Sequence, residues 1–292
     1  MIRAVAGRHN ESIKLAAKLQ SKKHRRERGL FVAEGLDLLA AALAAGEFPV
    51  EVLVRQDLLD RLPPELQAEA AGDELGIGVC SAETLAYASS LGGAADVVSI
   101  FESDEWALAD LDLAARTNVY LFGLGDPGNV GTLVRSAVAF GVTGLLCSPG
   151  TADPFSPKAL RAGMGAQFHA RIVTDVSAAD VASKLTADLG RGEEPPMIIL
   201  ADPRGDTRAA GLLDTIAPGD DGRSLSGVLL VLGSERGRLP ELTGIVKHVS
   251  IPQTGLESLN VAMAGTILLY ELTHERRSHA DPGRSVGPAR EG

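Results

Sequence analysis

Cysteine, tryptophan and long apolar runs are scarce in this 292-residue chain, and each scarcity excludes a class of protein. Two cysteines, Cys80 and Cys147, are too few for a disulfide framework or a metal cluster, and their apolar neighbours predict buried free thiols. No apolar run reaches the roughly 20 residues of a membrane span, and the first residues lack the apolar core of a secretion signal. We therefore expect a cytoplasmic protein with no metal site and no membrane partner.

The charge of the chain is unevenly distributed. Its total is −10, yet residues 1–28 hold nine basic and two acidic side chains, a net +7 that leaves −17 for the rest. A basic segment on an acidic body is typical of a module that contacts nucleic-acid phosphates. A solvated helix end explains the same charges equally well. The candidate RNA-binding residues of this segment are Lys22, Lys23, Arg25 and Arg26.

The first hundred residues predict a small α/β domain. A helix capped by Asn10 is expected to run to about Glu27. Short apolar strands and helical segments then alternate, with strands at 31–33, 50–56, 77–82 and 96–101. An acidic segment without clear periodicity follows, in which the single tryptophan, Trp106, is expected to pack at the junction. We place one domain at residues 1–105, a linker at 106–116, a second domain at 117–275 and a disordered tail at 276–292.

The second domain alternates strands and helices more regularly. Apolar strands are expected at 119–122, 144–148, 168–173, 197–202, 228–233 and 248–252, with most of 203–227 as loop and a last helix at 258–275. Nearly continuous apolar strands separated by helices predict a parallel sheet covered on both faces.

Three glycine-containing phrases follow strands of this domain: DPGNVGTLVRSA (126–137), VLLVLGSERGRL (228–239) and VSIPQTGLESLNVAMAGTILLYE (249–271). The carboxyl ends of parallel strands are where ligands bind. Gly123, Gly125 and Gly128 also spell G-x-G-x-x-G, which a nicotinamide-dependent dehydrogenase would use. That alternative requires an acidic residue after the second strand, where the chain has Cys147-Ser148-Pro149.

Together and in this order, the three phrases resemble the motifs of the SpoU/TrmH-type RNA 2′-O-ribose methyltransferases of the SPOUT superfamily. The resemblance covers roughly residues 118–271, and the basic segment with LFVAEG (30–35) resembles the family's ribosomal-protein-like substrate-binding domain. It implies an α/β fold with a trefoil knot, S-adenosylmethionine as methyl donor, and a homodimer that builds the active site across its interface. It favours ribosomal RNA over tRNA as substrate, and a resistance methyltransferase of the ribosome has the same layout.

The resemblance assigns site residues position by position. The catalytic set falls on Asn129, Arg135, Glu235, Ser258 and Asn260, and the groups that hold the adenosyl part fall on Leu232, Gly233, Ile251 and Leu259. The chain departs from the family pattern at Gly123-Leu124-Gly125, and at Gln253, where methionine is frequent. We expect these departures to reshape the cofactor loop locally.

The residue types suit the chemistry. Arg135 can grip a phosphate with two hydrogen bonds, or take part in removing the hydroxyl proton, although a guanidinium holds its own proton strongly. Ser258 can position that phosphate, Asn129 can hold the ribose, and Glu235 can orient donors. Asn260 is also well placed as a helix cap. A non-catalytic RNA-binding or ribosome-assembly protein of the same fold remains an alternative, and residues such as Arg161 and Lys158 either hold RNA or form a solvated helix face.

Overall fold

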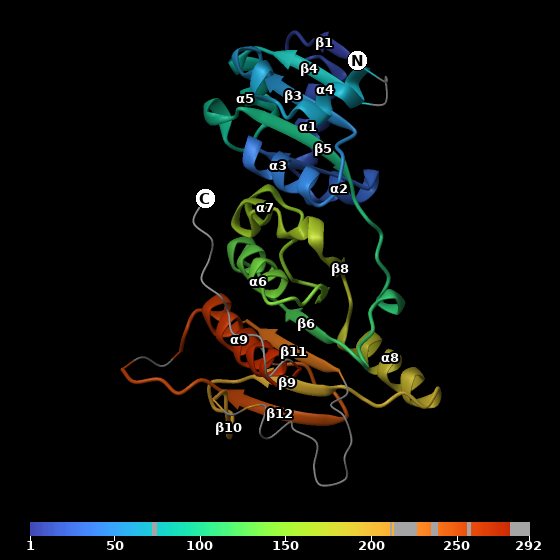
Figure 1. Cartoon of the computed structure of the whole chain (residues 1–292), viewed down its shortest axis with the longest axis vertical. Helices are drawn as coiled ribbons and strands as arrows, with labels where there is room; N and C mark the ends of the chain where they lie inside the picture. Colours follow the sequence, from blue (N-terminus) through green and yellow to red (C-terminus); the bar gives the residue numbers. More distant parts are fainter. Residues whose placement is uncertain (72–74, 211, 213–226, 235–238, 256–257, 281–292) are drawn as a thin grey trace.

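The computed structural model describes residues 1–71, 75–210, 212, 227–234, 239–255 and 258–280. Over these ranges the chain forms two separate β-sheets with helices on both faces of each (Figure 1). The first sheet has the order β1-β4-β3-β5-β2 and the second has the order β10-β12-β9-β11-β6-β7-β8. Among the described residues, no helix combines the length and the apolar character that crossing a membrane requires.

The first domain is a mixed sheet between two helical layers. Its strands are β1 (Ile2–Ala4), β2 (Leu30–Glu34), β3 (Glu51–Arg55), β4 (Gly76–Cys80) and β5 (Val97–Glu102). Its helices are α1 (Glu11–Leu19), α2 (Lys22–Arg28), α3 (Leu36–Ala44), α4 (Pro64–Ala71) and α5 (Ala82–Ala88). Alternate residues of each strand face opposite layers, so Phe31 and Ala33 pack with α3 whereas Val32 packs with α1 and α5.

The second domain is a parallel sheet. Its strands are β6 (Thr117–Phe122), β7 (Gly144–Cys147), β8 (Arg171–Val173), β9 (Met197–Ala201), β10 (Thr207–Arg208), β11 (Val228–Gly233) and β12 (Ile245–Ser250). Its helices are α6 (Pro127–Ala139), α7 (Pro157–Gly163), α8 (Ala178–Gly190) and α9 (Val261–Ala280). Helices α6 and α9 cover one face, and α8 with residues 111–113 covers the other. The predicted parallel sheet with helices on both faces is confirmed.

Helix α7 lies between the two sheets and joins the domains (Figure 1). Its Leu160 is fully buried in the core of the first domain. The ring of Phe155, just before α7, lies 5.0 Å from the ring of Phe31, and Phe168, just after it, lies 5.0 Å from Phe101. The two domains therefore share an aromatic contact, which fixes the first domain on the second.

Two ion pairs, each with one buried partner, cross the contact between the domains. In one the arginine belongs to the first domain, and in the other it belongs to the second. Arg25 of α2 donates from Nε and Nη2 to Oδ2 of Asp153, at 2.8 and 2.6 Å. Arg161 of α7 donates from Nη1 to Oε2 of Glu34, at 2.6 Å. The Glu34 side chain is 0% exposed and accepts further hydrogen bonds from Gln20 and from Ser89 and Ser90. Buried charges with several hydrogen-bond partners fix the orientation of the elements that carry them.

Two expected elements differ in the structure. The helix expected from Asn10 to Glu27 is two helices, because Ser21 has extended backbone and Arg25 Nη1 binds the carbonyls of Leu19 and Gln20 at the break. The strand expected at 168–173 begins only at Arg171, so the expectation that His169 lies on a strand is wrong. Residues 166–169 form a 3₁₀ turn, since the buried Gln167 side chain donates to two main-chain carbonyls.

Smaller differences concern boundaries. β1 has no counterpart among the expected strands, and the last helix begins at Val261 and extends to Ala280. Most of the expected loop at 203–227 and residues 281–292 of the expected tail lie outside the described residues.

Trp106 packs against the core of the second domain and carries the Arg171 guanidinium over its ring, 4.8 Å from the ring centre, as expected of a packing residue. Both cysteines are buried free thiols, as predicted.

Candidate active site

The candidate site lies at the carboxyl edge of the parallel sheet. Gly233, the last residue of β11, is in register with Phe122, the last residue of β6. Val249 near the end of β12 is in register with Ala201 at the end of β9. The three glycine-containing phrases therefore emerge at one edge, which is where ligands bind on an open parallel sheet.

Helix α6 begins at this edge with a strong local signal. Asp126 is its N-cap and accepts the main-chain N–H of Asn129 on Oδ1 at 2.9 Å, and Pro127 occupies the first turn. Lys158 of α7 donates to the other carboxylate oxygen at 2.9 Å. The Lys158 hydrogen bond, with the Asn129 N–H, lowers the pKa of Asp126. The carboxylate therefore stays ionised and holds Asn129 at the first turn of the helix.

The glycine turn before α6 is explained by geometry. Gly123 has a φ of +66°, and its N–H donates to Ser148 Oγ at 2.9 Å and Thr151 Oγ1 at 3.1 Å. Only glycine adopts this left-handed conformation without strain. Gly131 allows α6 to pack closely on α7, because a side chain there would meet the carbonyl oxygen of Ala159. The glycines set the turn and the helix contact.

Asn260 joins the first and third phrases. Its Oδ1 accepts the main-chain N–H groups of Ala262 and Met263, at 2.9 and 3.3 Å, so it caps α9. Its Nδ2 donates to Oδ1 of Asn129 at 3.1 Å. Asn260 therefore has both functions considered from the sequence: it is a cap, and it brings two candidate site residues into contact across 131 positions of sequence.

Arg135 lies two turns further along α6. Six residues separate it from Asn129, about 9 Å along the helix axis, and the two side chains leave the helix on different faces. Arg135 is exposed and, within the described part of the chain, makes no hydrogen bond or ion pair. The neighbouring Ser136 hydroxyl bonds that of Thr266 on α9, 2.7 Å away. Arg135 thus stands beside the contact of α6 with α9, and no group that the structure describes is bound to its guanidinium.

Of the two remaining catalytic candidates, Glu235 and Ser258, the structure describes Ser258. Glu235 lies outside the described residues. Ser258 is exposed and precedes the α9 cap by two positions.

The adenosyl-binding candidates surround the strand ends. Leu232 is fully buried in β11, Gly233 ends that strand, and Ile251 follows β12 and packs against the core. Leu259 is half-buried beside the α9 cap. In the same loop, the buried Oε1 of Gln253 has no hydrogen-bond partner within the described part of the chain.

The four candidate RNA-binding residues of the basic segment have different surroundings. Lys22 is exposed without a partner among the described residues, and Lys23 lies 3.8 Å from Glu27 on its own helix. Arg26 forms an exposed ion pair with Asp175 of the second domain. Arg25 is only 6% exposed and is bound to Asp153, so the expectation that it contacts RNA is corrected: it is an interdomain residue. Sequence spacing gives no signal for this distinction, because Asp153 is 128 positions away.

The sequence did not assign roles to Asp126, Glu34, Lys158 and Arg161, which the structure shows to be important. Asp126 was identifiable, since an Asp before Pro is a standard helix start. Glu34 and Arg161 owe their role to the domain contact, and Lys158 owes its role to the packing of α7 on α6. Both basic residues of α7 form ion pairs within the protein: Lys158, which is 59% exposed, with Asp126, and Arg161 with the buried Glu34.

Comparison with known proteins agrees with this geometry. Residues 116–270 match the model of the SpoU rRNA Methylase family, and residues 10–93 match an MRM3-like substrate binding domain. The chain belongs to the SpoU rRNA methylase family. This membership explains why strand ends β6, β11 and β12 all carry candidate residues, and it excludes the dehydrogenase interpretation of the glycine turn.

Similar proteins align with nearly the whole length of this chain. The 23S rRNA (guanosine(2553)-2′-O)-methyltransferase RlmP of Bacillus subtilis is 28% identical, over 90% of this chain and 96% of its own. The mitochondrial rRNA methyltransferase 3 of Homo sapiens is 27% identical, over 90% of this chain and 72% of its own. The crystal structure of an AdoMet-bound rRNA methyltransferase from Sinorhizobium meliloti superposes with a TM-score of 0.74 at 26% identity, covering 94% of this chain and 98% of that one.

Proposed function

We propose that this protein transfers a methyl group from S-adenosylmethionine to a ribose 2′-hydroxyl of ribosomal RNA. The observation that carries the proposal is the hydrogen bond between Asn129 and Asn260 at the carboxyl edge of the sheet, with Arg135 exposed on the helix of Asn129 and without a partner among the described residues. The family and the named rRNA methyltransferase relatives support ribosomal RNA as the substrate.

The residues present fit the cofactor. The half-buried Ile251 and Leu259 offer apolar contact for an adenosyl group beside main-chain groups at the strand ends, where Leu232 and Gly233 end β11. The buried, unpartnered Oε1 of Gln253 in this loop is an acceptor that suits an exocyclic amino group, because a buried acceptor without a donor is costly. When bound, S-adenosylmethionine supplies an electrophilic methyl group.

The protein's own part is to hold the hydroxyl in line and to neutralise the RNA backbone. Arg135 binds the phosphate next to the target ribose, since a guanidinium forms paired hydrogen bonds with phosphate oxygens and keeps its proton. Asn129, fixed by Asp126 and Asn260, holds the ribose, and Ser258 positions the phosphate. Glu235 orients donors from the loop after β11. Alignment of this kind lowers the barrier by removing the entropy of bringing the groups together.

A homodimer fits the exposed face of α9. Met263, Ile267 and Tyr270 lie at helical spacing on that helix and are 63%, 38% and 45% exposed. The ring of Tyr270 contacts Phe140, the residue that ends α6. We propose that a second copy covers this stripe, next to Arg135, so that each site is completed across the interface. The trefoil knot implied by the family belongs to the same proposal, as does a cytoplasmic location, which the two buried free thiols support.

The deciding experiment is transfer of labelled methyl groups from S-adenosylmethionine to unmodified ribosomal RNA and to tRNA, followed by mapping of the modified ribose. We expect incorporation into ribosomal RNA at one position. Arg135→Ala should reduce kcat/KM at least 100-fold, since it removes a charged contact of the transition state, while binding of S-adenosylmethionine by calorimetry stays unchanged.

Two outcomes would count against the proposal. Absence of incorporation into either RNA, with RNA binding retained, would favour the non-catalytic alternative. Full activity of Arg135→Ala would refute the role given to the guanidinium.

A further inference from the structure

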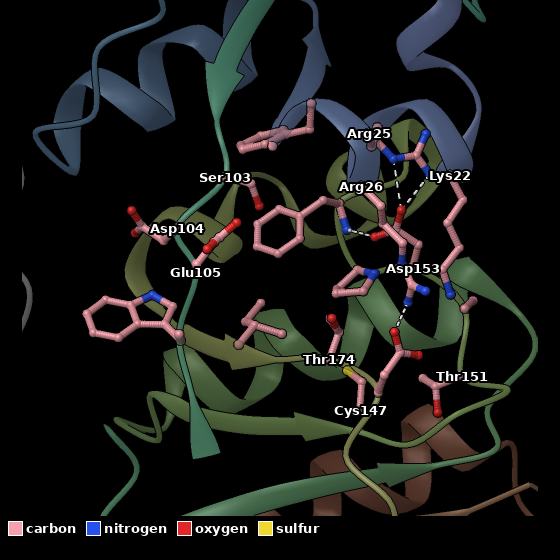
Figure 2. Close-up of a pocket in the computed structure, with 18 of the residues that line it drawn as sticks. Lys22, Arg25, Arg26, Ser103, Asp104, Glu105, Cys147, Thr151, Asp153 and Thr174 are labelled. Atoms are coloured by element: carbon pink, nitrogen blue, oxygen red, sulfur yellow. Dashed lines mark hydrogen bonds and ion pairs between the residues drawn. The ribbon is translucent and has the colours of Figure 1, made fainter. Parts of the chain in front are cut away.

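A cavity of about 330 Å³ lies between the two domains, away from the residues assigned above to catalysis and to the cofactor. Four segments line it: residues 22–31 of the first domain, residues 103–106 after β5, residues 147–155 and the end of β8 with the residues after it at 172–175 (Figure 2). Its volume is within the range of small-molecule sites, which commonly form at domain interfaces.

The charged residues around this cavity fall into two groups. Arg25 with Asp153, and Arg26 with Asp175, neutralise each other across the domain contact. Lys22, Asp104 and Glu105 make no hydrogen bond or ion pair with any residue that the structure describes. Figure 2 shows Asp104 and Glu105 on one side of the cavity and Lys22 on the other. Among the residues that the structure describes, the charges left for a ligand are therefore two carboxylates on one side of the cavity and one ammonium group on the other.

The Lys22 ammonium faces into the cavity. Figure 2 shows its side chain running toward Thr151. Burial raises the pKa of the Cys147 thiol to about 12, and the Lys22 charge opposes this rise, which places the ammonium within electrostatic reach of the cavity floor.

The lining also includes aromatic and apolar side chains beside the two ion pairs. Phe31, Phe155 and Trp106 line the cavity together with the buried Ile172. An aromatic middle with an ammonium group at one end and carboxylates at the other matches a nucleotide, which has a phosphate, a flat base and, on most bases, N–H donors at the far edge.

We propose that this interdomain cavity binds one unpaired nucleotide of the substrate RNA, its phosphate against Lys22 and the N–H edge of its base toward Asp104 and Glu105. The proposal rests on the proposed function, which supplies RNA as the substrate. Carboxylates accept from the N1–H and amino groups of guanine, whereas uracil presents mainly acceptors, so the cavity prefers guanine.

The cavity is well placed to act with the candidate active site. Ser148 and Thr151, which line it, accept the N–H of Gly123 in the turn that leads into α6. An RNA strand that places one nucleotide here is held on the same sheet edge as the methylated ribose. A nucleotide bound in the cavity would thus set the position of its neighbours along the strand.

The single tryptophan of the chain lines the cavity and reports on its occupancy. We would titrate the full-length protein with GMP and with UMP, following Trp106 fluorescence with excitation at the red edge of indole absorption and correcting with free tryptophan amide. GMP should change the emission saturably and bind more tightly than UMP. Lys22→Ala should weaken GMP roughly 5- to 10-fold, because a charged hydrogen bond to the phosphate is lost.

Matched variants separate this site from general electrostatics. Lys18→Ala removes one exposed charge from the same basic segment outside the cavity and should leave the GMP affinity unchanged. The double variant Asp104→Asn, Glu105→Gln should abolish the preference for GMP over UMP.

Three results would overturn the proposal: no saturable response to either nucleotide, equal weakening by the Lys18 and Lys22 substitutions, or a response to spermidine in place of GMP. If such a result came with normal methylation of ribosomal RNA, the cavity assignment alone would fail. Loss of methylation in the unmodified protein would instead refute the proposed function.

Discussion

Arg25→Ala is the substitution by which the interdomain contact is best tested. The Arg25 guanidinium makes four hydrogen bonds: two to Asp153, at 2.8 and 2.6 Å, and one each to the carbonyls of Leu19 and Gln20, at 2.8 and 3.0 Å. Among the residues that the structure describes, truncation leaves the Asp153 carboxylate with the N–H of Phe155 as its one donor, and it leaves the carbonyls of Leu19 and Gln20 without the Arg25 donor.

The expected destabilisation is large because one charge of a buried pair remains. Removing one partner of such a pair costs about 3–5 kcal/mol. Arg26→Ala is the matched control: its ion pair with Asp175 also crosses the domains, but the two side chains are 49% and 45% exposed. Exposed pairs contribute about 0–1 kcal/mol, so the neighbouring arginines should differ several-fold in effect.

Urea denaturation followed by Trp106 fluorescence and by circular dichroism measures both variants, since Trp106 lies at the domain junction. Replacing both partners, Arg25→Met with Asp153→Leu, should recover most of the lost stability, because no buried charge is then left alone. If Arg25→Ala and Arg26→Ala destabilise the protein equally, by less than about 1 kcal/mol, the rigid interdomain contact described here is wrong.

Three further predictions concern the candidate site and the dimer. Asn260→Ala removes the α9 cap and the contact with Asn129, so it should cost about 1 kcal/mol and lower kcat more than tenfold, whereas Asn260→Asp should keep the stability and lose only the activity; equal destabilisation by the two substitutions, or wild-type activity of Asn260→Asp, would contradict this. Because Lys158 and a main-chain N–H lower the pKa of Asp126, its carboxylate stabilises the fold at neutral pH, and this contribution is lost as the pH falls below the ordinary value of about 3.9. The Tm difference between the wild type and Asp126→Asn should therefore shrink in acid, and a constant difference would exclude the ion pair as its cause. Met263→Glu places a charge in the exposed stripe of α9 and should yield monomers by light scattering, with a dimer of unchanged affinity refuting the interface.

Local patterns in the sequence predicted the elements and the family. Nearly continuous apolar strands separated by helices predicted the parallel sheet, because both faces of such a sheet are covered. The three glycine-containing phrases identified the family, which matches residues 116–270. The cap function of Asn260 was also predictable, since an asparagine before a helix satisfies its first N–H groups.

The partners of charged side chains were not predictable. Arg25 has the same local sequence signal as Lys22, yet one is buried against Asp153 and the other is exposed. Whether a basic side chain in such a segment contacts solvent, RNA or a carboxylate depends on which distant segment packs against it. Composition does not predict that packing.

The sequence by itself thus determined most of the strands, the helix caps Asn10 and Asn260, and the family, because these follow from periodicity, capping and short motifs. Only the tertiary structure decided which residues meet: Asn129 with Asn260, Glu34 with Arg161, and the linker with α2 around the interdomain cavity. The physical reason is that these contacts join segments tens to more than a hundred residues apart. Their geometry is fixed by tertiary packing, of α6 against α9 for Asn129 with Asn260 and of α7 between the two sheets for Glu34 with Arg161.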